Sequence, residues 1–138
     1  TIRTNVTGVI NLCAAVAPAM VARGRGTIVN IGSSVANRSY AGSAVYASSK
    51  AAVHMFTDCL RAELHRTGVR VVEIQPGLVR TDFDLVRKAG DSEAAAAFYD
   101  GWGDYLSCDD VARAVLFAIA QPQEVIVSTM TVLPRSDW

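Results

Sequence analysis

The chain has 138 residues, about the length of one domain. Its 13 Lys and Arg residues balance 13 Asp and Glu residues, and this zero net charge argues against nucleic acid or an anionic membrane surface as the main partner. The apolar runs are short and interrupted, so we expect no membrane span, and residues 1–20 lack the pattern of a signal peptide.

The first half of the chain predicts a helix, a strand and a second helix. Apolar residues recur at helical spacing over residues 1–22, with a kink or an early end expected at Pro18. The β-branched run at residues 27–31 predicts a buried strand, and the Ser- and Gly-rich residues 32–43 predict a loop. An amphipathic helix is expected over residues 43–66.

The second half continues the alternation of strands and helices. Residues 69–74 predict a strand that ends at Pro76-Gly77, and residues 78–106 predict an irregular segment with short helical pieces. Residues 107–110 have the form of a capping box that opens a helix, and residues 125–132 predict a last strand. This order of elements indicates one α/β unit with a parallel sheet.

The three cysteines, Cys13, Cys59 and Cys108, are an odd number and have neither metal-site nor redox-pair spacing. We expect them to be small buried hydrophobic residues. Their pattern predicts a reducing, cytoplasmic location and no bound metal.

Tyr46 and Lys50 stand four residues apart in the second predicted helix, so both side chains are expected on one face. A fixed ammonium beside a phenol favours the phenolate and lowers its pKa from about 10. The nearby start of the helix also stabilises negative charge. A hydroxyl such as Ser33, brought alongside, could hold a carbonyl or alcohol oxygen while the phenol gives or takes its proton. These residues therefore indicate the acid–base half of a carbonyl/alcohol redox reaction.

Ser33 follows one predicted strand and residues 76–81 follow the next, at the edge where open α/β sheets bind ligands. Four segments of the chain resemble the motifs of the short-chain dehydrogenase/reductase family. A Tyr-x-x-x-Lys motif alone is a weak signal, whereas four motifs in the right order are a strong one. The four are Asn5-Val6-Thr7-Gly8, Gly26-Thr27-Ile28-Val29-Asn30-Ile31-Gly32-Ser33, Tyr46-Ala47-Ser48-Ser49-Lys50 and Pro76-Gly77-Leu78-Val79-Arg80-Thr81.

The resemblance implies a role for each matching residue. Tyr46 would be the general acid/base, and Ser33 would hydrogen-bond the substrate oxygen. Lys50 would lower the tyrosine pKa and bind the nicotinamide ribose hydroxyls. Asn5 would interrupt its helix and hold a water that connects Lys50 to solvent. The cofactor-binding residues implied by the resemblance are Tyr46, Lys50, Pro76, Gly77, Val79 and Thr81.

The resemblance also implies a Rossmann-type, doubly wound parallel sheet, with residues 1–138 as the C-terminal part of one NAD(P)-binding domain. The family's Gly-rich first turn is absent and the chain starts without methionine, so we expect the N-terminal half of this domain to be missing. The motifs are most similar in style to those of NADP-dependent 3-hydroxy acid (serine-type) dehydrogenases. We therefore expect NADP rather than NAD, although the residues that distinguish the two belong to the absent half.

Simpler interpretations of the same residues stay open. Tyr46 and Lys50 could be an ordinary surface pair on a helix. Ser33 lies in a loop where a turn or capping role is common, and its neighbour Ser34 could serve instead. Asn5 could be a solvated surface residue.

Thr81 could cap a short helix that begins next to it, with or without binding cofactor. His54 is expected to pack at a helix interface rather than act as a second base. The segment at about residues 82–106 is expected to form a lid over the substrate. The residues named for this lid are Tyr99, Trp102 and Tyr105, and those named as candidates for a substrate carboxylate are Arg80 and Arg87.

We therefore predict an NAD(P)-dependent oxidoreductase that transfers a hydride between nicotinamide and the carbonyl or alcohol carbon of a small molecule. An epimerase or dehydratase could use the same tyrosine and lysine. The non-catalytic alternative is an inactive truncated remnant that only associates with other subunits. The predicted helices at residues 1–22 and 43–66 resemble those through which the family forms dimers and tetramers, so a homodimer or homotetramer is expected.

Overall fold

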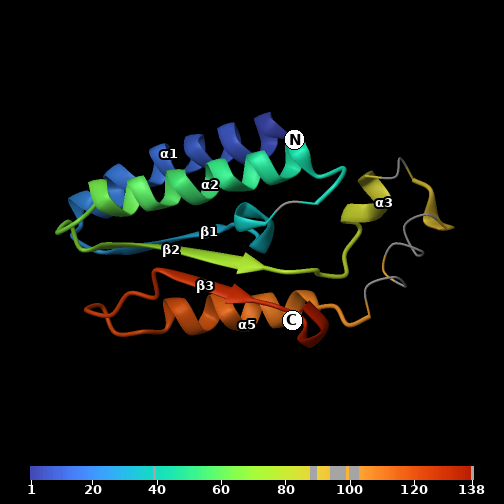
Figure 1. The fold of residues 1–138 in the computed structure, drawn as a ribbon. Coiled ribbons are helices and arrows are strands. Elements are labelled where there is room, and N and C mark those ends of the chain that lie inside the picture. The colour runs from blue at the N-terminus through green and yellow to red at the C-terminus, as the bar shows by residue number, and fades with distance from the viewer. Residues whose placement is uncertain (39, 88–89, 94–98, 100–102, 138) are drawn as a thin grey trace.

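Three parallel strands form one sheet in the order β1-β2-β3, and helices cover both of its faces (Figure 1). The predicted doubly wound α/β architecture is therefore confirmed. This computed structural model describes residues 1–38, 40–87, 90–93, 99 and 103–137.

The strand register places two polar side chains next to each other inside the sheet. β1 (Gly26–Ile31) pairs with β2 (Val69–Pro76), and Asn30 lies opposite Glu73. β2 also pairs with β3 (Thr129–Val132). β1 and β3 are the edge strands of this sheet, so within the described chain β1 has no partner on its outer side.

β3 is shorter than the strand expected over residues 125–132. Carbonyl groups before it accept hydrogen bonds from arginine side chains. Arg70 Nη1 donates to Val125 O at 3.1 Å, and Arg61 Nη2 donates to Ser128 O at 2.7 Å. The Ser128 carbonyl also accepts from Glu73 N of β2 at 3.0 Å, so an arginine and the sheet share this oxygen.

Two long helices cover one face of the sheet. They are α1 (Gly8–Ala22), which follows a π-helical turn, η1 (Arg3–Thr7), and α2 (Ala44–Glu63). The early helix end expected at Pro18 is wrong, because α1 continues through this residue. Pro18 lies on the exposed side, where water can satisfy the carbonyl that its ring leaves without a donor.

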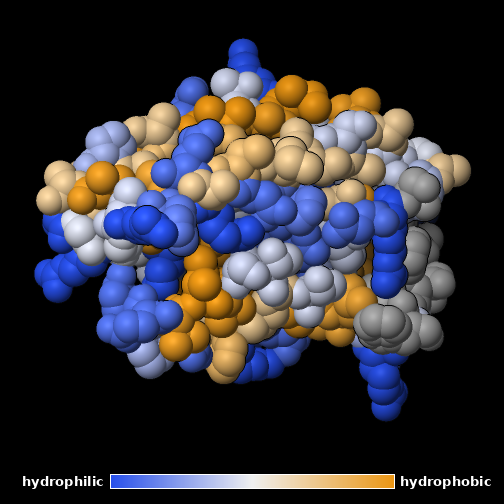
Figure 2. All heavy atoms as spheres, turned by 60° about the vertical axis from the view of Figure 1, so that its left-hand side comes forward, coloured by the Kyte–Doolittle hydropathy of each residue, from blue (hydrophilic) through white to orange (hydrophobic). Residues whose placement is uncertain are grey.

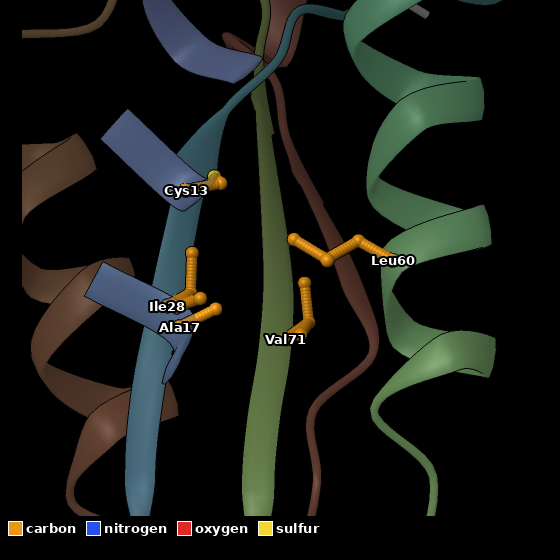
Figure 3. Close-up of a cluster of buried hydrophobic side chains, with 5 residues drawn as sticks. All are labelled: Cys13, Ala17, Ile28, Leu60 and Val71. Carbon is orange, nitrogen blue, oxygen red and sulfur yellow. The ribbon is translucent and has the colours of Figure 1, made fainter. Parts of the chain in front are cut away.

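The core beneath these helices is small and apolar. It joins the inner sides of α1 and α2 to the facing side chains of β1 and β2 (Figure 3). The buried residues of this cluster are Cys13, Ala17, Ile28, Leu60 and Val71.

Of the described helices, α5 (Cys108–Ile119) covers the opposite face of the sheet (Figure 1). Its small residues Ala114 and Ala118 pack against Val72 and Ile74 of β2. Strand β2, which the sequence predicts at this place, is therefore buried on both faces.

The capping box predicted before this helix is present. Ser107 Oγ accepts from Asp110 N at 3.2 Å, and the Asp110 carboxylate accepts from Ser107 N at 2.7 Å. Three short helices complete the described elements, each close to a strand or chain end. They are η2 (Ser34–Asn37), α3 (Phe83–Arg87) and η3 (Arg135–Asp137).

Apolar side chains remain exposed on the outer faces of the helices. Figure 2 shows them gathered along the upper edge of the molecule, the level at which Figure 1 draws α1 and α2. In the described chain one helix, Arg3–Ala22, is long and apolar enough to cross a membrane, and 11% of its apolar window is buried. The expectation that every apolar run is too short is therefore wrong for this helix, although one such helix near the N-terminus is weak evidence of a span.

All three cysteines carry free thiols, but only Cys13 is buried. Burial raises the pKa of the Cys13 thiol, and its side-chain contact with Asn30 partly opposes this shift. Cys59 and Cys108 are exposed, so the expected burial is wrong for these two residues. Their places on the solvent side of α2 and in the first turn of α5 account for the difference.

Candidate active site

The structure brings the predicted site residues to the carboxyl edge of the sheet. Ser33 follows β1, Pro76 ends β2, and Tyr46 and Lys50 lie in the first two turns of α2. Figure 1 shows the start of α2 and the short helix α3 at this same end of the sheet.

Ser33 is 6% exposed and caps η2. Its Oγ accepts from Val35 N at 3.4 Å and can donate to Pro76 O at 3.4 Å. Both distances are at the long end of the hydrogen-bond range, so the hydroxyl is held weakly. The Ser33 hydroxyl could therefore donate its hydrogen bond to a stronger acceptor placed at this edge.

Tyr46 and Lys50 lie on one face of α2, as the four-residue spacing predicts. Lys50 Nζ is 5.9 Å from the centroid of the Tyr46 ring. The ring also contacts Phe83 of α3, with centroids 5.2 Å apart. The half-buried Tyr46 ring thus has a cation and an apolar ring as neighbours.

Lys50 reaches across from α2 to the end of β1. Its Nζ donates to Ile31 O at 2.9 Å, two residues before Ser33. Burial lowers the pKa of Lys50, and the negative charge of Glu73 opposes that shift. Burial and the charge of Glu73 therefore act on the Lys50 pKa in opposite directions.

Asn5 lies in the π-helical turn η1, where the Gly8 N–H bonds to Arg3 O five residues back. Its Nδ2 donates to Ser49 Oγ at 3.1 Å, and Ser49 Oγ donates to Tyr46 O at 2.7 Å. The π-helical turn interrupts the regular helix at Asn5, and the contact with Ser49 shows that its side chain is not fully solvated. The Asn5 side chain thus contacts Ser49, the neighbour of Lys50.

The loop after β2 presents backbone groups to the same edge. Gly77 N donates to Val132 O at 2.8 Å, which fixes the loop to β3. Leu106 N donates to Leu78 O at 2.8 Å, and Arg80 N donates to Leu106 O at 2.9 Å. Val79 lies between these two bonds, and no acceptor within the described residues takes its N–H.

Thr81 closes this loop. Phe83 N donates to Thr81 Oγ1 at 3.2 Å, so Thr81 caps α3 as the simpler interpretation predicts. Tyr99 is buried, and its hydroxyl contacts Thr81 O at 3.1 Å. Tyr99 is therefore a structural support of the loop in this conformation.

Arg80 is paired with Tyr105. Its Nη1 donates to Tyr105 Oη at 2.5 Å, and its guanidinium carbon lies 5.1 Å from the Tyr105 ring centroid. This pairing disfavours the interpretation of Arg80 as a ready carboxylate ligand. Trp102 and the side chain of Arg87 lie outside the described residues.

Sequence reasoning missed a buried polar cluster beneath Lys50. Glu73 is 0% exposed, and its Oε2 lies 2.6 Å from His54 Nδ1. Gln75 Nε2 donates to the same oxygen at 3.0 Å. His54 thus contacts a buried acid rather than packing at a helix interface as expected. An acidic residue inside a β-branched strand, two residues before another polar one, is the signal that could have found this cluster.

A pocket of about 350 Å³ borders the site between η2 and the ends of β2 and β3. No group of three or more His, Cys, Asp or Glu residues that could hold a metal occurs in the described part of the chain. The residues that line the pocket are Ser34, Asn37, Arg38, Gln75, Thr131 and Leu133.

A family model described as short chain dehydrogenase matches residues 1–91. The chain is 42% identical over 134 residues to the NADP-dependent 3-hydroxy acid dehydrogenase of Salmonella typhi. The aligned region covers 96% of this chain and 54% of that relative. It is 41% identical over 139 residues to sulfoacetaldehyde reductase 2 of Chromohalobacter salexigens. This aligned region covers 99% of the chain and 55% of the reductase.

A solved structure of similar fold is the closed form of serine dehydrogenase complexed with NADP+. It matches with a TM-score of 0.90 and 41% identity, over 95% of this chain and 53% of that one. The chain spans about half the length of the curated relatives that it matches.

Proposed function

Because the chain belongs to the short-chain dehydrogenase family, we propose that it is the C-terminal part of an NADP-dependent oxidoreductase domain that interconverts a carbonyl and an alcohol. The observation that carries this proposal is the location of Tyr46, Lys50 and Ser33 at one edge of the sheet. The relatives named above include NADP-dependent enzymes, which supports NADP as the cofactor. Residues 1–138 then form one part of a single domain, with a lid at about residues 82–106.

Tyr46 is the general acid/base of the proposed reaction. In reduction its phenol gives a proton to the carbonyl oxygen, and in oxidation the phenolate takes the proton of the alcohol. The Lys50 ammonium, 5.9 Å from the ring centroid, favours the phenolate. Ser33 donates a hydrogen bond to the substrate oxygen and steadies the negative charge that develops there.

The donors and acceptors at this edge fit the nicotinamide end of the cofactor. The Val79 N–H, which has no acceptor within the described residues, and the Val79 carbonyl suit a carboxamide, while Pro76, Gly77 and Thr81 shape the loop. Lys50 would donate to the ribose hydroxyls. The cofactor supplies the hydride when it is bound.

Asn5 completes the proposed proton path. Its side chain fixes η1 to α2 through Ser49, one residue before Lys50. The widened turn at Asn5 frees backbone from regular helix pairing, which suits a held water. Such a water would connect Lys50 to solvent and return protons to Tyr46.

The test is nicotinamide turnover by the intact polypeptide that contains this chain. Absorbance is followed with NADPH and NADH over a panel of small aldehydes, ketones and hydroxy acids. We expect turnover with NADPH that is lost in Tyr46→Phe, while circular dichroism shows that the variant stays folded. A folded protein that neither binds nor turns over either cofactor would contradict the proposal.

We also propose a cytoplasmic homodimer or homotetramer that associates through α1 and α2. Leu12 of α1 is 69% exposed, and Met55 of α2 is 60% exposed. A second copy would remove these apolar side chains from water. The long, apolar helix Arg3–Ala22 then packs against protein rather than lipid.

Two other functions are weaker. The named relatives are dehydrogenases and reductases, which gives no support to a remnant that only associates. An epimerase or dehydratase would keep its cofactor through each cycle. Net consumption of free NADPH therefore separates these activities from the proposed one.

A further inference from the structure

Glu73 is a buried acid that the proposed proton path leaves without a role. Its carboxylate is 0% exposed in the middle of β2, on the sheet face covered by α1 and α2. Its Oε1 has no hydrogen-bond partner in the described structure. A buried carboxylate with one unsatisfied oxygen destabilises a fold unless a cation compensates it. Stability alone therefore does not account for this residue.

The second oxygen of Glu73 is held firmly. Oε2 lies 2.6 Å from His54 Nδ1 and accepts from Gln75 Nε2 at 3.0 Å. Gln75 is itself fixed, because its Oε1 accepts from Thr131 Oγ1 at 3.2 Å. The carboxylate thus has one orientation, with Oε2 toward His54 and Oε1 toward the end of β1.

That direction leads to the peptide that Lys50 also contacts. Lys50 Nζ donates to Ile31 O at 2.9 Å. Glu73 Oε1 occupies the place of a side chain on the next residue, Gly32, since a Cβ built there would lie 2.1 Å from it. The ammonium and the carboxylate therefore approach the same Ile31–Gly32 peptide, directly before Ser33.

We propose that Glu73 is a positioning residue of the proton-transfer site, whose carboxylate, oriented by His54 and Gln75, supplies the counter-charge that keeps Lys50 an ammonium. This inference rests on the proposed function. It accounts for the unsatisfied oxygen, for the burial of an acid inside a strand and for the glycine before Ser33. The shift of the Lys50 pKa agrees, since burial lowers it and Glu73 opposes the fall.

Titratable side chains of α2 lie next to both members of this pair. Tyr46 faces Lys50 from the preceding turn of α2, and His54 faces Glu73 from the following turn. Asp58 lies on the solvent side of His54, with its Oδ2 3.9 Å from Nε2. Asp58 is thus a carboxylate near the same histidine that does not point toward Lys50, which makes it a matched control.

The first test measures the protonation of Lys50 directly, by NMR of isotope-labelled lysine in the intact protein. Residues 1–138 contain one other lysine, Lys88, so K50R and K88R variants assign the signals. E73Q keeps the shape of Glu73 and removes its charge. We expect the titration midpoint of Lys50 to fall by about one pH unit in E73Q and to stay unchanged in D58N.

A midpoint that stays unchanged in E73Q, or that moves as far in D58N, would overturn the inference. If E73Q does not fold, the double variant E73Q/H54Q replaces the pair by two neutral amides and serves the same test. Both variants keep a polar side chain at each position, so the cluster retains groups that can hydrogen-bond.

The second test is the pH profile of alcohol oxidation with NADP+. We expect activity to fall at high pH, where Lys50 loses its charge. E73Q should move this fall in activity to lower pH. E73D, which restores the charge of residue 73, should move it back. A merely structural role would lower the rate equally at every pH. Wild-type protein without turnover would contradict the proposed function, whereas normal turnover with an unmoved Lys50 midpoint would contradict this inference alone.

Discussion

The Glu73 carboxylate occupies the space that a side chain on Gly32 would need. A Cβ on Gly32 would lie 2.1 Å from Glu73 Oε1. The carboxylate cannot move aside freely, because it is fully buried and bonded to His54. We therefore expect Gly32→Ala to lower the free energy of unfolding by about 1–3 kcal/mol, measured by urea denaturation.

The matched control for this substitution is Gly8→Ala. A Cβ on Gly8 would meet Arg3 O at 3.7 Å, an ordinary contact, and the residue starts the helix α1. Alanine there should be neutral or stabilise by up to about 1 kcal/mol. If the cost of Gly32→Ala persists in a Glu73→Ala background, the carboxylate is not its cause.

Ser33→Ala should lower kcat without changing stability much. The Ser33 hydroxyl makes only long contacts, at 3.4 Å, within the protein, so its main role is predicted to be with the substrate oxygen. Loss of one such donor lowers kcat by about 10²–10³-fold. Ser34→Ala is the control, and steady-state kinetics at saturating NADPH provide the measurement. An equal loss in both variants would contradict the distinction between these two serines.

The sequence predicted the layers of this fold well, because each strand and helix carries a clear period. Residues 27–31 are a β-branched run that forms most of β1, and Ser107 with Asp110 forms the capping box that opens α5. The sequence-based predictions were wrong where contacts between residues far apart in the sequence determine the structure. The residues before the shortened β3 contact arginine side chains of α2 and β2, which no local pattern predicts.

The candidate site divides in the same way. Tyr46 and Lys50 are one helical turn apart, so their proximity follows from local geometry. Glu73 and His54 are 19 residues apart, and only the packing of α2 on the sheet brings them together. The register of β1 on β2, which places Gly32 beside the carboxylate, is likewise absent from any local pattern.

Lys50 should make stability depend on pH in alkaline solution. Burial lowers its pKa in the folded chain below the usual 10.5. Between these two values the unfolded chain holds a proton at Lys50 that the folded chain has released, so the free energy of unfolding rises with pH. Below the window both states are protonated and the contribution is constant.

The measurement compares urea unfolding of wild type and Lys50→Met from neutral pH to about pH 10. Every other titrating group is common to both proteins, so the difference between them isolates Lys50. We expect the stability of wild type to rise with pH relative to the variant. A difference that stays flat would show that Lys50 keeps its ordinary pKa after folding.

Met55→Glu should weaken the proposed association through α2. Met55 is 60% exposed and would lie between two copies, where an unpaired carboxylate is costly. Size-exclusion chromatography with light scattering should show a smaller species at equal concentration. Val86→Glu, at an exposed apolar residue of α3, is the control and should leave the mass unchanged. An unchanged mass in both variants would place the interface elsewhere.

Arg70 joins β2 to the end of α5 and to the turn that follows it. It is 9% exposed, so its hydrogen bonds are mostly shielded from water. Both Nε and Nη2 donate to Thr27 Oγ1, at 3.0 and 2.9 Å. Its other acceptors are the backbone oxygens of Ile119, Gln121, Pro122 and Val125.

Arg70→Met should therefore lower the free energy of unfolding by about 3 kcal/mol, because Thr27 and several partly buried carbonyls lose their donor. Arg70→Lys should recover little of this loss, since one ammonium cannot reach both Thr27 and the carbonyls at the end of α5, which the guanidinium contacts together. Arg113→Met is the control, because that side chain is 68% exposed and should change stability by less than about 0.5 kcal/mol. Urea denaturation decides, and a full rescue by lysine would show that the charge of Arg70 matters rather than its fork of donors.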